Sequence, residues 1–200
     1  GQVLPEPYPA ENGCLVVREM ADYLAMDLVR KGLVTDQLVL DVGYDIDNLK
    51  DPERRKQYKG PVKEDHYGRQ VPAPAHGSQN FKNPTSSSLE MIEAAERIYR
   101  RVVNPSLLVR RFYLSVNRLK EEDAAEETPL PEQLSLFRDY EAETRQAQKE
   151  AARRSKERKA QETVLAIRDR FGKNAVLRGM NFEEGATARE RNAQVGGHHE

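Results

Sequence analysis

The residue types that support catalysis are sparse in this chain. Asp45 and Asp47 could share a metal ion, as the carboxylates of two-metal enzymes do. They follow a predicted strand into a loop, however, and no glycine-rich phosphate motif lies near them. His66 and His76 are too far apart, and too poor in neighbouring ligands, to predict a metal site. No nucleophile–base pair stands out either, so we assign no catalytic residue, no metal and no other cofactor to this chain.

A short apolar peptide is the sharpest binding feature. Residues 133–137 read Gln133-Leu134-Ser135-Leu136-Phe137 and lie in a polar stretch that offers their large side chains no local core. Exposed apolar anchors in such a stretch usually enter a pocket on a partner protein. Burying each Leu or Phe contributes about 1.5–3 kcal/mol, which predicts micromolar binding after the ordering costs are subtracted. The pattern alone leaves open that the peptide folds back onto its own domain.

A second binding feature is a strand with one polar face, predicted over residues 107–118. Alternation with a period of two separates its side chains into two sets. Phe112, Leu114 and Val116 form the apolar set, and the polar set is Arg111, Tyr113, Ser115 and Asn117. The polar set offers one cation and several hydrogen-bonding groups on one side of the strand. An ordinary solvated sheet face would show the same pattern.

The stretch between residues 45 and 75 carries a third group of charges. Its cations are Arg54, Arg55, Lys56, Lys59, Lys63 and Arg69, and the carboxylates among them are Asp51, Glu53, Glu64 and Asp65. This mixture is equally compatible with contact to an anionic ligand and with mutual neutralisation in solvent. The stretch is poor in apolar residues and rich in Pro and Gly, so we predict a long excursion between two strands.

The elements that position these residues follow from hydrophobic periodicity. Helices are predicted at residues 14–31 and 87–103, and strands at 37–44, 76–82 and 107–118. Residues 1–13 are expected to form a loop that begins with the end of a mostly missing strand. This order predicts an α+β fold: a four-stranded, mostly antiparallel sheet with two helices on one face.

Local signals support both helices. Ser87 and Glu90 fit a reciprocal S-x-x-E capping box at the start of the second helix. Gly32 suits the C-terminal cap of the first helix. The predicted buried stripes are Val17, Met20, Leu24 and Leu28 in the first helix, and Leu89, Ile92, Ala95, Tyr99 and Val102 in the second.

Composition divides the chain into a compact part and a more extended part. Only 38% of its 200 residues are hydrophobic and 32% are charged, which is polar for a fully packed chain. Residues 1–120 form the predicted compact domain, and residues 121–140 an acidic linker that contains the peptide. Residues 141–171 are predicted to be a charged, solvated helix, and residues 172–200 an irregular tail with several glycines. The net charge of -1 requires any basic surface to arise from local segregation of charge.

The cellular setting follows from a few absences in the sequence. Cys14 is the only cysteine, which excludes an internal disulfide and suits a reducing cytoplasm. No apolar run approaches the ~20 residues of a membrane-spanning helix, so we expect no membrane partner. The chain begins with Gly1 and not with Met, so we expect it to start inside a longer protein.

The peptide at residues 133–137 resembles a known motif. It matches at every position the pattern Q-L-[SD]-L-F, by which bacterial polymerases and repair proteins bind the sliding clamp. The resemblance implies that Leu136 and Phe137 enter the main clamp pocket and that Leu134 lies in a shallower site. It also implies that the Gln133 amide forms a hydrogen bond at the rim.

A second resemblance spans nearly the whole chain. It is carried by residues 14–44, by D-H-Y-G-R at 65–69, by A-H-G at 75–77, by L-V-R-R at 108–111 and by R-F-G-K-N-A-V-L-R-G-M-N at 170–181. These segments resemble the little-finger domain of Y-family DNA polymerases, in the UmuC/DinB-like branch of Gram-positive bacteria. In that family the little finger lays its sheet along the DNA backbone, and the catalytic carboxylates that bind magnesium lie upstream in a palm domain. The resemblance implies that residues 1–120 are a DNA-binding domain and that the cations of residues 45–75 could touch the duplex. It also implies that Arg111 meets a phosphate, while Tyr113, Ser115 and Asn117 offer hydrogen bonds that position the backbone without reading its sequence.

The resemblances imply the DNA-binding and clamp-binding portion of a translesion DNA polymerase, which acts in DNA repair and in the SOS response. By this interpretation the chain is no enzyme on its own, whereas its parent is a DNA-directed DNA polymerase. One rival hypothesis is a stand-alone, clamp-associated repair accessory or regulatory protein without polymerase activity. Another is an enzyme complete in these residues, which the lack of a nucleophile–base pair, metal cluster or phosphate loop disfavours.

Overall fold

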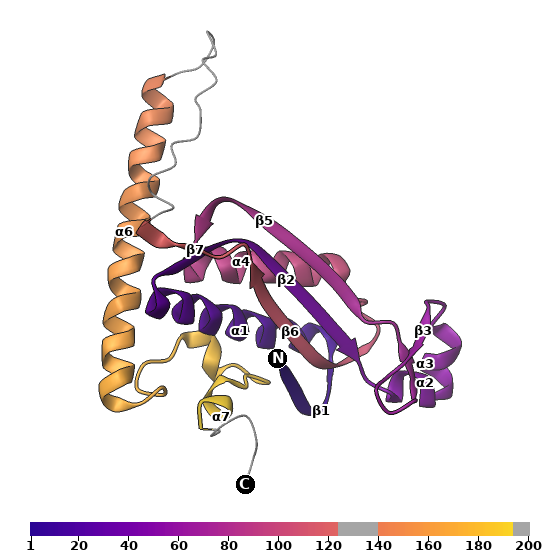
Figure 1. Cartoon of the computed structure of the whole chain (residues 1–200). Coiled ribbons are helices and arrows are strands. Elements are labelled where there is room, and N and C mark those ends of the chain that lie inside the picture. The colour runs from indigo at the N-terminus through magenta and orange to yellow at the C-terminus, as the bar shows by residue number, and fades with distance from the viewer. Residues whose placement is uncertain (124–139, 194–200) are drawn as a thin grey trace.

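A computed structural model describes residues 1–123 and 140–193 of the chain. An antiparallel sheet with the strand order β1-β6-β2-β5 forms its centre, and the short β7 pairs with the start of β2. The strands are β1 (Gln2–Pro9), β2 (Leu33–Tyr44), β5 (Ala75–Thr85), β6 (Leu108–Asn117) and β7 (Lys120–Glu121). Helices α1 (Ala10–Lys31) and α4 (Ser88–Val102) cover one face of the sheet and leave the other open (Figure 1). The predicted α+β class is therefore confirmed.

Alternation along the strands separates the core from the open side of the sheet. In β2, Leu38, Leu40 and Val42 are fully buried beneath the two helices, as is Phe112 in β6. The residues between them point to the side without helices and are at least partly exposed. The period of two in the sequence therefore sets which side chains face the core and which face outward.

Residues 1–13 are not a loop, so this part of the sequence prediction is wrong. β1 pairs with β6 at both of its ends, through Gln2 and Val3 and again through Tyr8 and Pro9, with a shift of register between them. Its three prolines lack backbone N–H donors, which an edge strand tolerates because one side of it needs no partner. Helix α1 then begins at Ala10, several residues earlier than the apolar pattern indicates.

Gly13 lies inside α1 because the helix approaches its neighbours closely there. A Cβ at this position would collide with the Tyr99 hydroxyl and with the Val109 side chain. The Tyr99 hydroxyl donates a hydrogen bond of 2.6 Å to the Ala10 carbonyl, and burial raises the pKa of Tyr99, so the hydroxyl remains a donor at neutral pH. The glycine that favours a loop in the sequence thus permits tight packing of a helix.

Half of the capping box predicted for α4 is confirmed. Ser87 Oγ accepts a hydrogen bond of 3.1 Å from the Glu90 backbone N–H. The Glu90 carboxylate does not return it to Ser87, whose own N–H donates to Thr85 Oγ1, but pairs with Arg154 at 3.2 Å. The predicted stripe of α4 is wrong at Leu89, which is 38% exposed; the helix buries Met91, Ala94, Ala95, Ile98 and Tyr99.

Residues 45–74, which we call the insert, connect β2 to β5 and contain short elements of their own. These are α2 (Asp47–Lys50), α3 (Pro52–Gln57), β3 (Val62–Glu64) and β4 (Gln70–Pro72). Strands β3 and β4 form a separate hairpin, and the whole insert lies at the end of the main sheet where β2 finishes (Figure 1). The predicted long excursion is therefore present, and it is structured.

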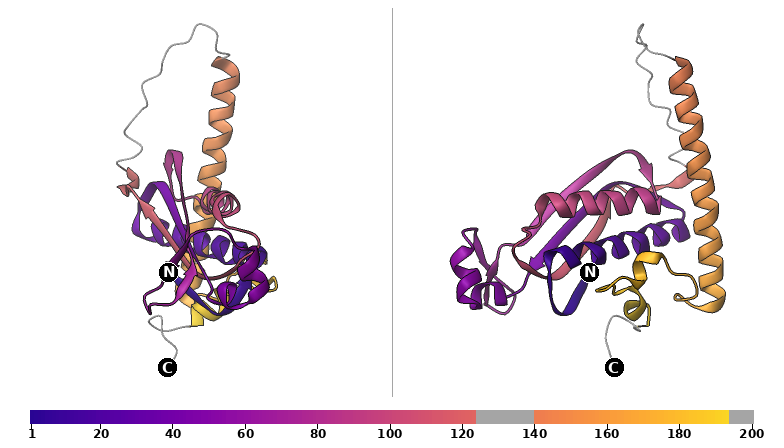
Figure 2. Two further views of the ribbon diagram at one scale, coloured as in Figure 1. Left: turned by 90° about the vertical axis from the view of Figure 1, so that its right-hand side faces the viewer. Right: turned by 180° about the vertical axis from the view of Figure 1, so that it is seen from behind.

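The C-terminal part consists of one long helix and a segment that returns to the domain. Helix α6 (Tyr140–Phe171) crosses one end of the sheet and projects beyond it (Figures 1 and 2). Side chains 144–156 are exposed, as expected for a solvated helix. The prediction is wrong for the second half of α6, which packs on the domain and buries Gln161. Residues 172–193, predicted to be mostly irregular, contain the short helices η1 (Gly179–Phe182) and α7 (Ala188–Ala193) and contact α1.

Candidate nucleic-acid interface

The side of the sheet without helices, which we call the open face, is built from outward-facing residues of β6, β2 and β5. Antiparallel pairing sets these residues in rows across the three strands. Three rows are complete: Asn117–Gln37–Asn80, Ser115–Val39–Ser78 and Tyr113–Asp41–His76. A fourth row places Arg111 opposite Gly43. All four residues predicted to contact DNA, Arg111, Tyr113, Ser115 and Asn117, therefore lie on the same face of β6.

Hydrogen bonds across the strands hold several of these side chains in place. The Asn117 amide donates to Gln37 Oε1 over 3.0 Å, and the Gln37 amide donates to Asn80 Oδ1 over 2.9 Å. Nδ1 of His76 lies 2.7 Å from Asp41 Oδ1. One end of the open face is thus a fixed array of neutral amides, which suits contacts to a backbone and not to one base sequence.

Arg111 lies at the other end of the open face, next to the insert. Gly43 gives it room, because a Cβ there would lie 3.3 Å from Arg111 Cβ. Within the described residues, no ion pair involves Arg111, whereas Arg110 pairs with Asp45 at 3.5 Å. A guanidinium that is partly exposed and has no carboxylate beside it is free to bind an external anion.

Lys82 supplies a second cation of this kind. It continues the outward alternation of β5, is exposed, and takes part in no ion pair within the part of the chain that the structure describes. Lys120 nearby is different, since it lies 3.6 Å from the Asp36 carboxylate. The basic character of the open face therefore depends on Arg111 and Lys82.

The apolar peptide Gln133-Leu134-Ser135-Leu136-Phe137 lies outside the described residues. The described chain before it ends just after β7, and the described chain after it begins with α6.

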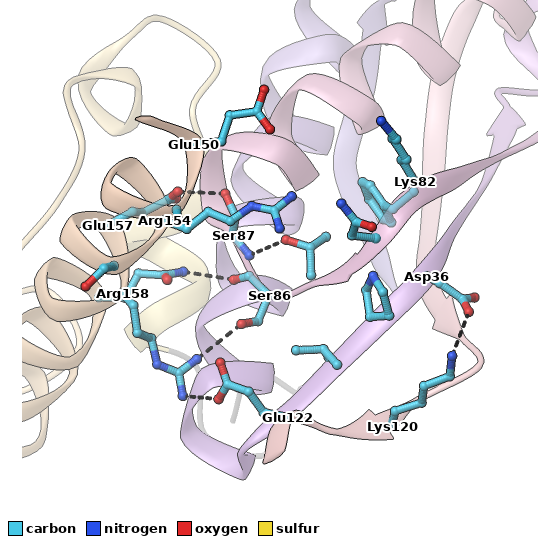
Figure 3. A pocket seen from close by; sticks show the side chains of 18 of the residues that line it. Asp36, Lys82, Ser86, Ser87, Lys120, Glu122, Glu150, Arg154, Glu157 and Arg158 are labelled. Carbon is cyan, nitrogen blue, oxygen red and sulfur yellow. Dashed lines mark hydrogen bonds and ion pairs between the residues drawn. The ribbon is translucent and has the colours of Figure 1, made fainter. Parts of the chain in front are cut away.

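A groove of about 1090 Å³ separates α6 from the connection between β5 and α4 (Figure 3). Charged groups pair across it: Arg158 lies 2.6 Å from Glu122, and the Ser87 hydroxyl donates to Glu157 over 2.7 Å. The buried amide of Gln161 donates to the Ser86 carbonyl at the base of α4. Because these polar groups form hydrogen bonds and ion pairs with one another, we interpret the groove as the contact region that attaches α6 to the domain.

Sequence reasoning missed a buried carboxylate on α1. Glu19 is 2% exposed and accepts four hydrogen bonds from the returning C-terminal segment. The donors are the Asn181 amide (2.8 Å), the Thr187 N–H (2.8 Å) and hydroxyl (3.0 Å), and the Ala188 N–H (2.9 Å). We call Glu19 with residues 178–188 the clasp. The available signal was the position of Glu19 within a largely apolar stretch, two residues after Val17 and directly before Met20.

An ion pair also strengthens the clasp. Arg178 Nε lies 2.8 Å from Asp22 Oδ1, one helical turn beyond Glu19, and the Asp22 side chain is almost fully buried. Arg191 stacks over Tyr23 at 5.7 Å from the ring centroid, and burial lowers the pKa of its guanidinium. The C-terminal segment is therefore attached to α1 mainly through two buried carboxylates, Glu19 and Asp22.

Two further properties bear on the class of site. Among the described residues, no group of three or more His, Cys, Asp and Glu side chains is arranged to hold a metal ion. No helix in the described ranges is both long enough and apolar enough to span a membrane.

Comparison with models of known families identifies the family of the chain. The model of the impB/mucB/samB family C-terminal domain matches residues 4–136. The chain belongs to this family. It is the C-terminal domain of UmuC/DinB-type Y-family DNA polymerases, so that part of the resemblance is confirmed. The match covers the sheet domain and ends before α6 and the C-terminal half of the clasp. No curated protein and no solved structure matches the chain.

Proposed function

We propose that this impB/mucB/samB-type domain grips the backbone of primer-template DNA with its open face and tethers its parent polymerase to the sliding clamp through residues 133–137. The parent would be a translesion DNA polymerase of the Gram-positive, UmuC/DinB-like branch. It would act in the cytoplasm, in DNA repair and the SOS response. Magnesium would bind in its palm domain, and we assign no catalytic residue to the chain itself.

The observation that carries the DNA-binding proposal is the composition of the open face. Arg111 and Lys82 lack carboxylate partners within the described residues, and a fixed row of amides lies between them. Cations neutralise phosphates, and amides and hydroxyls donate to phosphate oxygens without selecting a sequence. A polymerase must hold every sequence equally well, so a surface of this type suits its task.

Charge reversal at Arg111 tests the DNA-binding proposal. Arg111→Glu is expected to weaken binding to a primer-template duplex by about tenfold or more at low salt, because an attraction becomes a repulsion. It should also flatten the dependence of affinity on salt. Arg100→Glu is the matched control, since Arg100 is an exposed arginine on the helical side of the sheet. Equal affinities of the unmutated chain and Arg111→Glu would remove Arg111 from the interface.

The clamp-binding proposal rests on the match of residues 133–137 to the motif. A tether of this kind raises the effective concentration of polymerase at the primer end, so that modest contacts combine into useful avidity. The described elements on either side are compatible with this role, because β7 and α6 both belong to the folded part of the chain. The peptide would therefore be held near the DNA-binding domain.

Calorimetric titration into purified bacterial sliding clamp tests the tether. We expect micromolar binding that a Leu136→Ala/Phe137→Ala double variant abolishes. Leu130→Ala is the matched control, since it removes a leucine from the same linker but outside the motif. Absence of binding by the unmutated chain would refute the tether and leave the DNA-binding proposal standing.

The assignment of catalysis to the parent is tested with the chain alone. Incubation with primed template, nucleotides and magnesium should leave the primer unextended, because the proposal places the metal-binding carboxylates in another domain. Extension of the primer would contradict it.

A further inference from the structure

The insert is firmly attached to the domain and therefore presents its outer end in a fixed direction. Asn48 is fully buried, and its amide donates to the carbonyls of Asp45 (2.9 Å) and Leu108 (2.8 Å). Its side-chain oxygen accepts from the Leu108 N–H over 2.8 Å. These bonds tie the start of the insert to the start of β6, only a few residues from Arg111. A ligand held on the insert would thus lie beside the open face.

The tip of the β3–β4 hairpin, residues 65–69, is a preformed turn. The Asp65 carboxylate accepts hydrogen bonds from the N–H groups of Tyr67 (2.9 Å) and Arg69 (3.0 Å). It also pairs with the Arg69 guanidinium at 2.6 Å, and these hydrogen bonds lower the pKa of Asp65 to about 2. Gly68 adopts a φ of 73°, which a residue with a side chain rarely takes. The turn is therefore fixed throughout the neutral pH range.

This turn displays an aromatic ring to solvent. Tyr67 is 70% exposed, the largest exposed fraction among the large hydrophobic residues of the described chain. The Arg69 guanidinium lies over the ring at 4.9 Å from its centroid, and His66 meets it edge-on at 5.4 Å. The ring is therefore oriented by its neighbours while most of it remains accessible. An aromatic ring held in this way loses little conformational entropy when a flat ligand stacks on it.

The charges of the insert favour an anionic ligand. Four of its carboxylates are already paired, namely Asp45, Asp47, Asp51 and Asp65. The cations outside any ion pair of the described residues are Arg55, Lys56, Lys59 and Lys63, and the carboxylates left are Glu53 and Glu64. The groups that remain available thus carry a net positive charge, although the sequence of the insert is nearly neutral.

We propose that the hairpin tip is a binding site for single-stranded DNA, in which an unpaired base stacks on Tyr67 and the adjacent phosphates meet the unpaired cations of the insert. Stacking platforms next to cations are the usual basis of sequence-independent binding to single strands. Duplex DNA fits this site poorly, because its base faces are already stacked on one another. The insert lies at the end of the sheet where β6 begins, which would suit the single-stranded template next to a duplex on the open face (Figure 1). In this respect the inference extends the proposed function.

Fluorescence anisotropy with a labelled oligothymidine tests the site in the full chain. Tyr67→Ala should weaken binding by about tenfold, whereas Tyr67→Phe should retain it because the ring is preserved. Phe182→Ala is the matched control, since Phe182 is a similarly exposed ring with an arginine 5.6 Å from its centroid on another part of the molecule. Thermal unfolding of each variant should remain unchanged, because Tyr67 contributes nothing to the core.

Parallel titrations with duplex DNA separate this inference from the proposed function. Tyr67→Ala should leave duplex binding unchanged, and Arg111→Glu should weaken it. If Arg111→Glu leaves duplex affinity unchanged while Tyr67→Ala weakens binding to oligothymidine, the proposed DNA contact of the open face is refuted and the single-strand site is supported. The single-strand site is refuted if Tyr67→Ala binds oligothymidine as tightly as the unmutated chain. It is also refuted if Tyr67→Ala weakens duplex and single strand equally, or if its only effect is on binding to the clamp protein.

Discussion

On the helical side of the domain, the Glu19 carboxylate is 2% exposed and accepts four hydrogen bonds from the C-terminal segment. On the open face, Arg111 is partly exposed and belongs to no ion pair within the described residues. Both are charged groups on regular elements that pack against the same core. The difference indicates that the clasp is structural, because its charge is satisfied internally, and that the open face is available to an external ligand.

Removal of the Glu19 carboxylate should have the largest effect on stability. Glu19→Ala leaves Asn181, Thr187 and Ala188 as buried donors without an acceptor, so we expect a loss of about 3–5 kcal/mol in the free energy of unfolding. Urea denaturation measures this loss. Glu11→Ala is the control, since it removes an exposed carboxylate from the first turn of the same helix and should cost less than about 1 kcal/mol. A loss below about 1 kcal/mol for Glu19→Ala would show that the clasp contributes little to stability.

The two glycines of the sheet extend the same comparison to packing. A Cβ on Gly77 would lie 2.8 Å from both Ile98 and Val102 of α4, whereas a Cβ on Gly43 would approach only the Arg111 side chain. Gly77→Ala should therefore destabilise the protein by about 1–3 kcal/mol through overpacking. Gly43→Ala should change the free energy of unfolding by less than about 0.5 kcal/mol. Equal effects in thermal or urea unfolding would mean that α4 moves away from the sheet easily.

Much of the sheet was predictable, since β2 and β6 are long and alternate over most of their length, as their sequence pattern indicates. The N-terminal region was not, because the prolines of β1 and Gly13 are normally signs of a loop. Here an edge position tolerates the prolines, and contact with Tyr99 requires the glycine. The polar set of β6 could be predicted because its side chains share one strand. The clasp could not, because it joins residues that are far apart in sequence through a carboxylate normally expected in solvent.

Two lysines, Lys82 and Lys120, test whether an ion pair within the protein prevents a cation from binding DNA. Lys82 belongs to no ion pair of the described residues, whereas Lys120 lies 3.6 Å from Asp36. Lys82→Ala should reduce the slope of log affinity against log salt for duplex DNA by about 0.9, as expected for the loss of one phosphate contact. Lys120→Ala should change it less, because that charge is already neutralised. Identical slopes for both variants would contradict the distinction between paired and unpaired cations.

The smallest effect is expected at the hairpin turn, where Asp65 and Arg69 form an ion pair that solvent screens. The pKa of Asp65 is lowered from its ordinary value of 3.8 to about 2, first by the side-chain hydrogen bond from Arg69 and then by the N–H groups of Arg69 and Tyr67. A depressed carboxyl pKa stabilises the folded turn above about pH 4, and this contribution is lost as the pH falls toward 2.

The Tyr67 amide resonance reports this loss directly. It should titrate with a midpoint near 2 in the unmutated chain and show no such step in Asp65→Asn. A midpoint near 3.8 would mean that the turn is open in solution. The Tyr67 ring would then have to be ordered by its ligand, and the single-strand site would bind more weakly than a preformed platform allows.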